Sequence, residues 1–513
     1  MEAAEALGRS SSSSLADWVR QAVRARSAVF WAVVGLTALA AALRFGTLGL
    51  QAYHHDEIVT ASRILRGGFW HAMDAVGFSE SAPPLYYAIA WVWTQLTGTG
   101  EFGLRSISAL AGVATVPVAY LIGAELRSRR AGLAAAALVA VNPMMLWYSQ
   151  EARAYALFSL LTAISFLYFS RALRRGRRRD FIGWGIASAL ALATHYFAFF
   201  PIAAEAVWLL RRRGWTSLRG LWIVALVGAL LAPLAIHQTS IGHAEWIGNY
   251  PLIHRLWEAA VTFAIGETGD IIARTVHPLL AVVPLALIVA ALTLLYTRGD
   301  GRERRAAGVP LAIAAATVAV PILLALASPS KDYVLARNLM PALVPLLVAV
   351  GVAVTIRGAR RSGAAIGTAL FAYSLGFCVW ASFSPALQRP DWDAVAAKLG
   401  EPAAPRAIVT WTLGEASLRH YLSTGSFQAF PTEGFDWLVH EVDFVSDGPA
   451  PPVPARLIGP GFRQVGYGQA GRLYVRRYAL PGPGLAPLRL RSVRSAELGF
   501  RTNGVLVDGI GPR

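Results

Sequence analysis

Residues 27–57 read SAVFWAVVGLTALAAALRFGTLGLQAYHHDE, an apolar run followed directly by a cluster of ionisable side chains. A helix needs about 20 mostly apolar residues to cross a bilayer. The run is long enough for this as far as Leu50, and Arg44 is the charged residue within it. The stretch therefore predicts a membrane-spanning helix that carries the cluster 53–57 to one membrane surface.

The rest of the chain repeats this apolar pattern. Of its 513 residues, 55% are hydrophobic and 15% are charged, so most of the chain requires an apolar solvent. Stretches that qualify as membrane spans, or nearly do, have centres at Thr37, Thr115, Leu138, Leu161, Ala187, Ala203, Val227, Val283, Val318, Ala349 and Tyr373. We therefore predict a polytopic α-helical membrane protein with about 11 transmembrane helices.

The basic residues predict how the spans are oriented. The chain has 47 Lys and Arg against 30 Asp and Glu, which would indicate nucleic-acid binding if the charges shared one soluble face. They cluster instead between apolar runs, so we expect no nucleic-acid partner. Six segments hold 24 of them: 1–26, 127–130, 171–179, 211–219, 298–305 and 357–361. The positive-inside rule places these segments, and with them the N-terminus, in the cytoplasm.

The alternate loops then lie outside. Residues 83–96 are apolar but short, and counting them as a span would move every later arginine cluster to the outside. We therefore expect a helix that lies on or dips into the outer face. An outer loop over 51–104 and a second over 238–270 follow from this topology.

The predicted domain organisation has three parts. Residues 1–26 contain a serine tract and form a disordered cytoplasmic tail. Residues 27–383 form the transmembrane module. Residues 384–513 alternate β-rich runs, such as 407–411 and 472–478, with Pro/Gly turns, which predicts a small extracytoplasmic α/β domain.

Several functions find no support in the sequence. The single cysteine, Cys378, lies in an apolar run, so an intrachain disulfide and a cysteine-based metal site are excluded. A phosphate-binding P-loop and an HExxH motif are both absent from the sequence, which argues against an ATP-driven pump.

Chemistry-bearing residues gather at the outer level. His54, His55, Asp56 and Glu57 follow the first span and offer general-base, proton-relay or metal-ligand groups. Further ionisable or polar residues reach the same level at span ends, where such residues are costly and tend to be functional. They are Glu80, Tyr86, Glu151, Arg153, His195, Lys331, Tyr333 and Arg337.

The order of these motifs resembles a known superfamily. A DE pair follows the first span, and PPLYY, YSQEARAY, RNLMP and RPDW come later in that order. The pattern is similar to the protein O-mannosyltransferase and aminoarabinose-transferase superfamily, GT-C glycosyltransferases related to glycosyltransferase family 39. The resemblance implies transfer of a sugar from a polyprenyl phosphate to an acceptor hydroxyl, with inversion at the anomeric carbon.

The resemblance also implies roles for individual residues. Asp56 matches the catalytic carboxylate and would act as base, for which partial desolvation beside the bilayer would raise its proton affinity. Glu57 is the alternative base or a partner that orients the acceptor. Arg153 and Arg337 would bind the donor phosphate, and His195 would donate a hydrogen bond to it.

Other residues are candidates for the acceptor or the pocket wall: His54, His55, Glu80, Tyr86, Glu151, Lys331 and Tyr333. No metal is required by this scheme, but a divalent ion on His55 and Asp56 stays open. Adjacent histidines on an extended loop point to opposite sides, so we expect at most one of His54 and His55 to share a ligand sphere with Asp56.

The sequence thus predicts a polyprenyl-phosphate-sugar-dependent hexosyl- or pentosyltransferase. Its partners would be membrane lipids, the lipid-linked sugar and a protein, lipid or cell-envelope glycan acceptor. An alternative is a transporter or flippase of a lipid-linked sugar, and a third class is a non-catalytic scaffold. Two lysines among the 47 basic residues, together with the alanine-rich helices, indicate a GC-rich bacterium and hence its plasma membrane.

Overall fold

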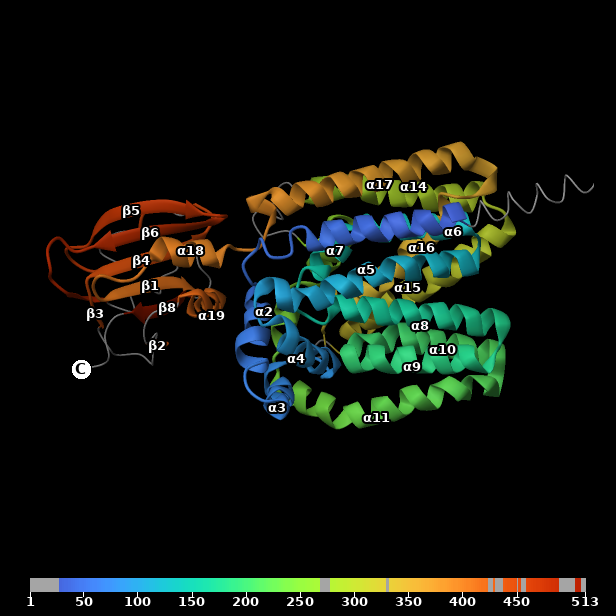
Figure 1. Ribbon diagram of the computed structural model, residues 1–513, viewed down its shortest axis with the longest axis horizontal. Coiled ribbons are helices and arrows are strands. Elements are labelled where there is room, and N and C mark those ends of the chain that lie inside the picture. Colours follow the sequence, from blue (N-terminus) through green and yellow to red (C-terminus); the bar gives the residue numbers. More distant parts are fainter. Residues whose placement is uncertain are drawn as a thin grey trace, which may run out of the picture.

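A computed structural model describes residues 27–267, 277–328, 332–422, 428–429, 437–449, 451–453, 458–488 and 503–508. The predicted tail 1–26 and the candidate residue Lys331 lie outside these ranges. The molecule has two parts along its long axis, a bundle of long helices and a smaller unit built on a sheet (Figure 1).

The bundle consists of helices at all of the predicted centres. They are Ser27–Phe45, α5 (Glu101–Leu126), α6 (Arg129–Val141), α7 (Pro143–Ser149), α8 (Tyr155–Arg175), α9 (Arg178–Thr194), α10 (Phe199–Arg213), α11 (Leu218–Ile241), α14 (His277–Arg298), α15 (Gly301–Ala327), α16 (Leu343–Ala353) and α17 (Arg360–Phe383).

Length and composition identify many of these helices as membrane spans. Within the described ranges, 8 helical runs are long and apolar enough, or up to 9 when α6 and α7, bent by 56°, count as one span. One of the runs, Tyr196–Ile241, contains two helices, α10 and α11, separated by η3 (Gly214–Ser217). If α10 and α11 are counted as two spans, and the 17-residue α9 is added, the helices account for all 11 predicted stretches. The predicted polytopic helical membrane fold is confirmed.

A buried arginine stabilises the bend between α6 and α7. Pro143 lacks the N–H that would continue the α6 hydrogen bonds, so carbonyl groups at the end of α6 lose their helical partners. Arg44, fully buried, donates to the carbonyl oxygens of Ala140 (2.9 Å) and Val139 (3.4 Å). Its Nε also donates to Ser149 Oγ (3.1 Å), which joins the first helix to both sides of the bend.

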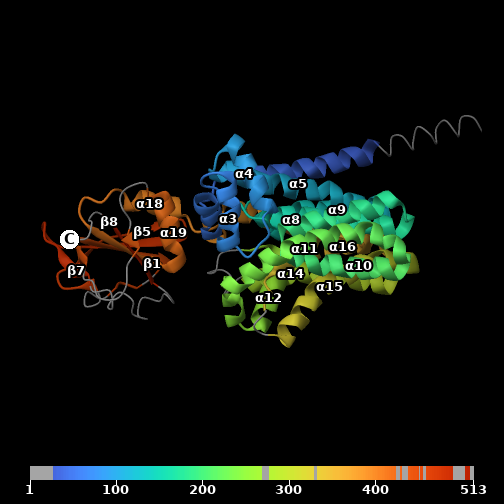
Figure 2. The same cartoon turned by 90° about the horizontal axis from the view of Figure 1, so that it is seen from below.

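The loops between spans divide into two sets at opposite ends of the bundle. At the end away from the sheet, the arginine-rich segments contact one another: Arg127 pairs with Glu303 (2.9 Å), and Arg174 pairs with Glu125 (3.2 Å). The outer loop 51–104 lies at the other end, between the bundle and the sheet (Figure 2). The separation of loops predicted from the basic residues therefore exists in the fold.

The outer loop folds into short helices: α2 (His55–Ile58), the π-helix η1 (Val59–Ile64), α3 (Phe69–Ser79) and α4 (Leu85–Thr97). With 13 residues, α4 is too short to cross a bilayer. It buries Tyr86, Tyr87 and Ala90 on one side and exposes Val92 and Leu96 on the other. The helix therefore packs on the protein with one side and presents apolar side chains on the other, as expected for a segment that dips into the membrane surface.

The sheet unit follows α17 through α18 (Trp392–Leu399). Its six-stranded sheet has the order β2-β8-β1-β4-β6-β5, in which β1 and β4 are parallel and the other neighbours are antiparallel. The strands are β1 (Arg406–Trp411), β2 (Gln428–Ala429), β4 (Glu441–Asp447), β5 (Arg463–Ala470), β6 (Leu473–Ala479) and β8 (Asn503–Asp508). A two-stranded sheet pairs β3 (Trp437–Val439) with β7 (Ala486–Leu488). α19 (Thr412–Tyr421) lies on the side of this unit that faces the bundle (Figure 1).

Candidate active site

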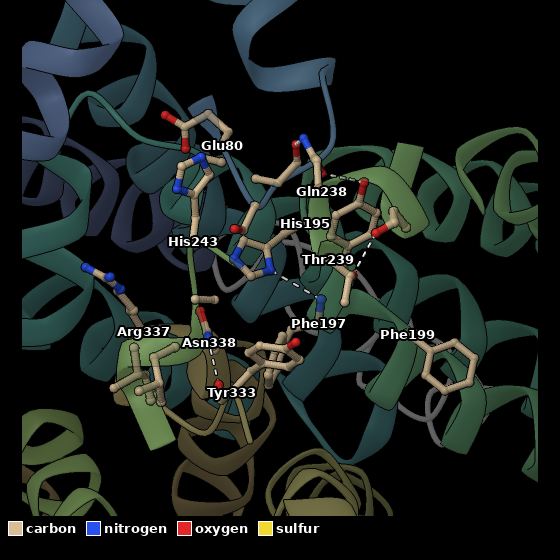
Figure 3. A pocket seen from close by; sticks show the side chains of 18 of the residues that line it. Glu80, His195, Phe197, Phe199, Gln238, Thr239, His243, Tyr333, Arg337 and Asn338 are labelled. Atoms are coloured by element: carbon tan, nitrogen blue, oxygen red, sulfur yellow. Dashed lines mark hydrogen bonds between the residues drawn. The ribbon is translucent and has the colours of Figure 1, made fainter. Parts of the chain in front are cut away.

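A cavity of about 690 Å³ opens among the outer loop, α9, α11 and η6 (Ala336–Ala342). Its polar wall contains Asp56, Glu80, Arg153, His195 and Arg337, some of which Figure 3 shows. Mostly apolar side chains of α9, α10 and α11 also line the cavity, together with Gln238 and Thr239 of α11. With Tyr333, which also lines it, six of the predicted site residues from four separate loops therefore share one space.

Asp56 lies at the start of α2 and faces this cavity. Its Oδ2 is 3.2 Å from Arg337 Nη1, and its Oδ1 is 3.3 Å from His55 Nε2. Burial alone would raise the pKa of Asp56. The hydrogen bond from His55 and the positive charges of Arg337 and Arg153 outweigh burial and hold this pKa well below its usual range. The predicted raised proton affinity was therefore wrong for the resting site, because the hydrogen bond from His55 and the two arginines stabilise the carboxylate.

Glu57 points away from the cavity and is fully buried. Arg105 donates to both carboxylate oxygens (2.7 and 2.8 Å), and the backbone N–H groups of Ala152 (2.8 Å) and His54 (2.9 Å) donate as well. Burial would raise the pKa of Glu57, but Arg105, with Arg389 and Ala152, lowers it to about 2. A carboxylate so fully hydrogen-bonded has no free oxygen for an acceptor, so its geometry favours a role in holding the loop rather than that of a base.

Arg153 and Glu80 form a two-pronged ion pair on the cavity wall. Arg153 Nη1 and Nη2 donate to the two oxygens of Glu80 at 2.7 and 2.6 Å. Arg153 also donates to the backbone carbonyl of Asp56 (3.4 Å) and to Thr60 Oγ1 (3.2 Å). These bonds occupy much of the guanidinium, so Arg153 connects the loop after α3 to α2.

The guanidinium of Arg337 makes fewer hydrogen bonds than that of Arg153. Among the described residues, its one side-chain hydrogen bond goes to Asp56, and its guanidinium lies 5.9 Å from the centre of the Tyr155 ring. The guanidinium has five N–H donors in a planar fork, which suits the oxygens of a phosphate. Arg337 therefore retains donors that a bound anion can use.

His195 follows α9 and lies against aromatic rings. Its ring stacks on Phe158 at 4.6 Å, and its Nδ1 accepts a hydrogen bond from the N–H of Phe197 (3.2 Å). Burial, with the charges of Arg337 and Arg153, lowers the pKa of His195 to about 3. The ring is thus neutral with its proton on Nε2, which lies on the side of the ring away from Phe197 (Figure 3). This tautomer has one ring N–H to donate, and its donation to a donor phosphate stays a prediction.

The remaining candidates have different positions. Tyr333 lines the cavity. Tyr86 and Glu151 do not: Tyr86 is buried in the packing of α4, where its neighbour Tyr87 reaches the cavity instead, and Glu151 is buried 3.3 Å from Arg389. The difference between Tyr86 and Tyr87 arises because successive helical residues point about 100° apart.

His54, His55 and Asp56 lie closer together than expected. One ligand atom from each lies within 4.8 Å of the others, and the two imidazole rings are 3.8 Å apart. The expectation that the histidines diverge was wrong because the segment is not extended: His54 caps α2, and the helix begins at His55. Imidazole and carboxylate ligands would suit zinc or a similar ion. Both oxygens of Asp56 already interact with His55 and Arg337, so the requirement for a metal stays a hypothesis.

Three residues in and around the site were not assigned roles from the sequence. Arg105 and Arg389 are almost fully buried around Glu57, which Arg389 approaches to 3.9 Å, and Arg389 also lies 3.3 Å from Glu151. Gln238 of α11 donates to the carbonyls of Val76 and Ala82 and so holds the α3–α4 connection. A signal existed for Arg105, since an arginine at the start of an apolar span requires a partner.

Comparison with known proteins agrees with this architecture. Residues 81–237 match the family described as dolichyl-phosphate-mannose-protein mannosyltransferase. ArnT from Cupriavidus metallidurans bound to undecaprenyl phosphate is similar with a TM-score of 0.51 and 16% sequence identity, over 87% of this chain and 97% of that chain. Archaeal oligosaccharyltransferase AglB from Archaeoglobus fulgidus, in complex with an inhibitory peptide and a dolichol-phosphate, has a TM-score of 0.45 and 13% identity, over 77% and 59% of the two chains.

Among curated proteins, no sequence matches this chain. The similarity to ArnT shows the fold. The predicted GT-C fold and the predicted resemblance to the O-mannosyltransferase and aminoarabinose-transferase superfamily are therefore confirmed.

Proposed function

We propose that this protein is an inverting glycosyltransferase that moves a sugar from a polyprenyl phosphate to an acceptor hydroxyl at the membrane surface. The observation that carries the proposal is the Asp56–Arg337 pair, 3.2 Å apart, in a cavity that is also lined by apolar side chains of α9, α10 and α11. A lipid-linked sugar has the same division into a charged head and an apolar chain. The fold supports the proposal, because the structure of ArnT that it resembles contains undecaprenyl phosphate.

The apolar wall provides a place for the lipid chain. Leu192, Phe199, Phe200, Leu231 and Ala235 line it from α9, α10 and α11. Phe199 is 58% exposed, so this wall continues to the outside of the bundle, where acyl chains would surround it. An isoprenoid chain that entered between these helices would bring its phosphate to the polar wall.

Arg337 is the proposed main phosphate ligand, and His195 donates a second hydrogen bond through Nε2. Arg153 is proposed to contribute charge while it remains paired with Glu80. In this proposal the three groups bind the phosphate oxygens. No general acid is needed, because the polyprenyl phosphate monoester that departs is already a good leaving group.

Asp56 is proposed to act as the base. It accepts the proton of the acceptor hydroxyl while the acceptor oxygen forms a bond to the anomeric carbon. The bond from this carbon to the phosphate oxygen breaks, and polyprenyl phosphate leaves with the electron pair. Attack opposite to the leaving group inverts the anomeric carbon.

Donor binding is proposed to activate this base. In the resting site Arg337 lowers the proton affinity of Asp56. A phosphate that draws the guanidinium toward itself removes part of this stabilisation, so the carboxylate becomes a stronger base when the donor is present. A divalent ion, if one is required, would be held by His54, His55 and Asp56 and would supply positive charge at Asp56.

We further propose that the sugar is a hexose or pentose and that the acceptor is a protein, a lipid or an envelope glycan. The reaction would take place on the outer face of a bacterial plasma membrane, since the arginine-rich loops lie at the opposite end of the bundle.

The test is sugar transfer by the purified full-length protein in nanodiscs. Radiolabelled polyprenyl-phosphate sugars are offered with native membrane extract as acceptor, to the wild type and to Asp56→Asn, with EDTA or with added Mg²⁺, Mn²⁺ or Zn²⁺. We expect label to move with the wild type only, and to do so in EDTA. If no label moves although the wild type carries the lipid across the bilayer, the transporter hypothesis replaces the enzyme.

A further inference from the structure

The sheet unit contacts the catalytic segment through the last turn of α19. The hydroxyl of Tyr421 accepts a hydrogen bond from the backbone N–H of Tyr53 (2.6 Å) and donates one to Glu101 Oε1 (2.7 Å). Tyr53 begins the motif that contains Asp56, and Glu101 begins α5. One side chain of the sheet unit therefore fastens the start of the motif to a long helix of the bundle.

The preceding residue, His420, adds two contacts. Its Nδ1 forms a hydrogen bond with Ser62 Oγ (2.8 Å), which lies in η1 just after α2. Its ring meets the ring of Tyr53 at 5.7 Å in an edge-to-face arrangement. Contacts from α19 thus lie on both sides of Asp56 in the sequence.

Tyr53 transmits this contact to the acidic residues. It is fully buried, its hydroxyl donates to the carbonyl of Thr99 (2.8 Å), and Arg105 lies 5.1 Å from the centre of its ring. Arg105 in turn holds Glu57 through two hydrogen bonds. The position of Tyr53 is therefore coupled to the buried ion pair of Glu57, the residue next to Asp56 in the chain.

The catalytic segment needs such support from outside. α2 has only four residues, which is far too short to be stable without packing. The N–H of Tyr53 has its partner in the sheet unit, about 368 residues away in sequence. Without α19 this buried donor would lose its hydrogen bond.

We propose that the sheet unit positions the base of the reaction, and that Tyr421 is a positioning residue whose hydroxyl sets the place of Asp56. The proposal rests on the function proposed above. In this proposal the C-terminal unit takes part in the chemical step without contacting the acceptor. Tyr421 contacts the motif at Tyr53 and does not line the cavity.

The first test compares Tyr421→Phe with Tyr467→Phe in the full-length protein. Each variant loses one hydroxyl from the same unit, and Tyr467 lies half-exposed on β5, away from α19. We expect Tyr421→Phe to lower kcat roughly 10-fold, because small displacements of a reacting group are costly, while KM for the donor changes less than about twofold. Tyr467→Phe should retain wild-type kcat.

The second test does not need catalysis. Hydrogen–deuterium exchange of the peptide covering residues 51–58 should become at least about tenfold faster in Tyr421→Phe, since one buried amide loses its partner. Exchange of α8 and α16 should be unchanged, which excludes general unfolding.

Unchanged exchange and unchanged kcat in Tyr421→Phe would overturn the proposal. A rise in donor KM with constant kcat would also overturn it, because Tyr421 would then act on donor binding. A wild type without transferase activity would remove the proposed function, whereas the exchange experiment would still decide whether α19 holds the motif.

Discussion

Asp56 and Glu57 are neighbours in the chain but lie in opposite environments. Asp56 is partly exposed to the cavity, whereas Glu57 is sealed against Arg105. Removing one partner of a buried ion pair typically costs about 3–5 kcal/mol, because the other charge stays buried and unpaired. We expect Glu57→Gln to lower the thermal unfolding midpoint strongly and Asp56→Asn to change stability by less than about 1 kcal/mol.

Thermal unfolding followed by tryptophan fluorescence in detergent checks this pair of variants, with transfer assays on the same preparations. Asp56→Asn should be folded and inactive. A well-folded Glu57→Gln protein with no activity would contradict this assignment and restore Glu57 as a base.

Arg337 should bind the donor through the shape of its guanidinium as well as its charge. Arg337→Lys keeps the charge but loses the planar fork, so we expect Kd for polyprenyl phosphate to rise about 10-fold. Arg302→Lys, at the exposed start of α15, is the matched control and should bind as the wild type does. Equal affinity in Arg337→Lys and wild type, measured in nanodiscs, would show that the phosphate lies elsewhere.

Glu151 should make stability depend on pH. Burial raises its pKa from the usual 4.5 to about 7, with Arg389 opposing the change. The folded state therefore holds this proton more tightly than the unfolded state, so stability from this group falls as pH rises from about 4.5 to about 7 and is constant above that.

Glu151→Gln should remove this dependence. Between about pH 4.5 and 7, the unfolding free energy of the wild type relative to the variant should change by up to about 3 kcal/mol. This figure follows from the shift in pKa at about 1.4 kcal/mol per pKa unit. Thermal midpoints of both proteins from pH 4.5 to 8.5 provide the measurement. A difference that is constant with pH would mean that folding does not raise the pKa of Glu151.

The sequence could place individual residues at a membrane surface where they lie at the end of a predicted span. Asp56, Arg153, His195 and Arg337 were placed correctly on one surface, because each follows or begins an apolar run. The pattern of residue types could not show whether Asp56 or Glu57 faces the cavity. This depends on how α2 turns and on its packing against Arg105.

At the scale of elements, the bend between α6 and α7 depends on Arg44. Within the membrane, carbonyl groups left free by Pro143 find no water to replace a lost partner. Arg44→Met would leave the carbonyls of Val139 and Ala140 unpaired, and we expect a loss of about 2–3 kcal/mol. Arg130→Met, exposed at the start of α6, is the matched control and should be neutral within about 0.5 kcal/mol.

Thermal stability in detergent, together with the monodisperse fraction on gel filtration, checks this expectation. Equal stability of the two methionine variants would mean that the bend is held by other contacts, such as the hydrogen bond from Cys378 to the carbonyl of Val141.

Long elements could be predicted more fully than short ones. Every long apolar run became a helix, since length and hydropathy alone decide this. The segment around His54 and His55 was expected to be extended, because four residues of helix leave no periodic signal. The short helix packs against α19, and its Glu57 pairs with Arg105; both partners are remote in sequence.

At the scale of the whole molecule, the separation of charges predicts an orientation in the membrane. The arginine-rich loops gather at one end of the bundle, and the sheet unit lies at the other (Figure 1). The positive-inside rule then assigns the first end to the cytoplasm and the sheet unit to the outside. The sequence predicted this separation because each span reverses the chain, whereas the docking of the sheet unit on the outer loop left no sequence signal.

Cysteine labelling tests this orientation directly. Cys378 is the single cysteine of the chain and is buried, so Cys378→Ala provides a background without reactive thiols. Arg302→Cys and Glu401→Cys then place one exposed thiol at each end of the molecule. A membrane-impermeant maleimide should label Glu401→Cys in intact cells and Arg302→Cys only after the membrane is opened. The reverse pattern would place Asp56 and its cavity on the cytoplasmic face, where the lipid-linked donor would have to be used before it crosses the membrane.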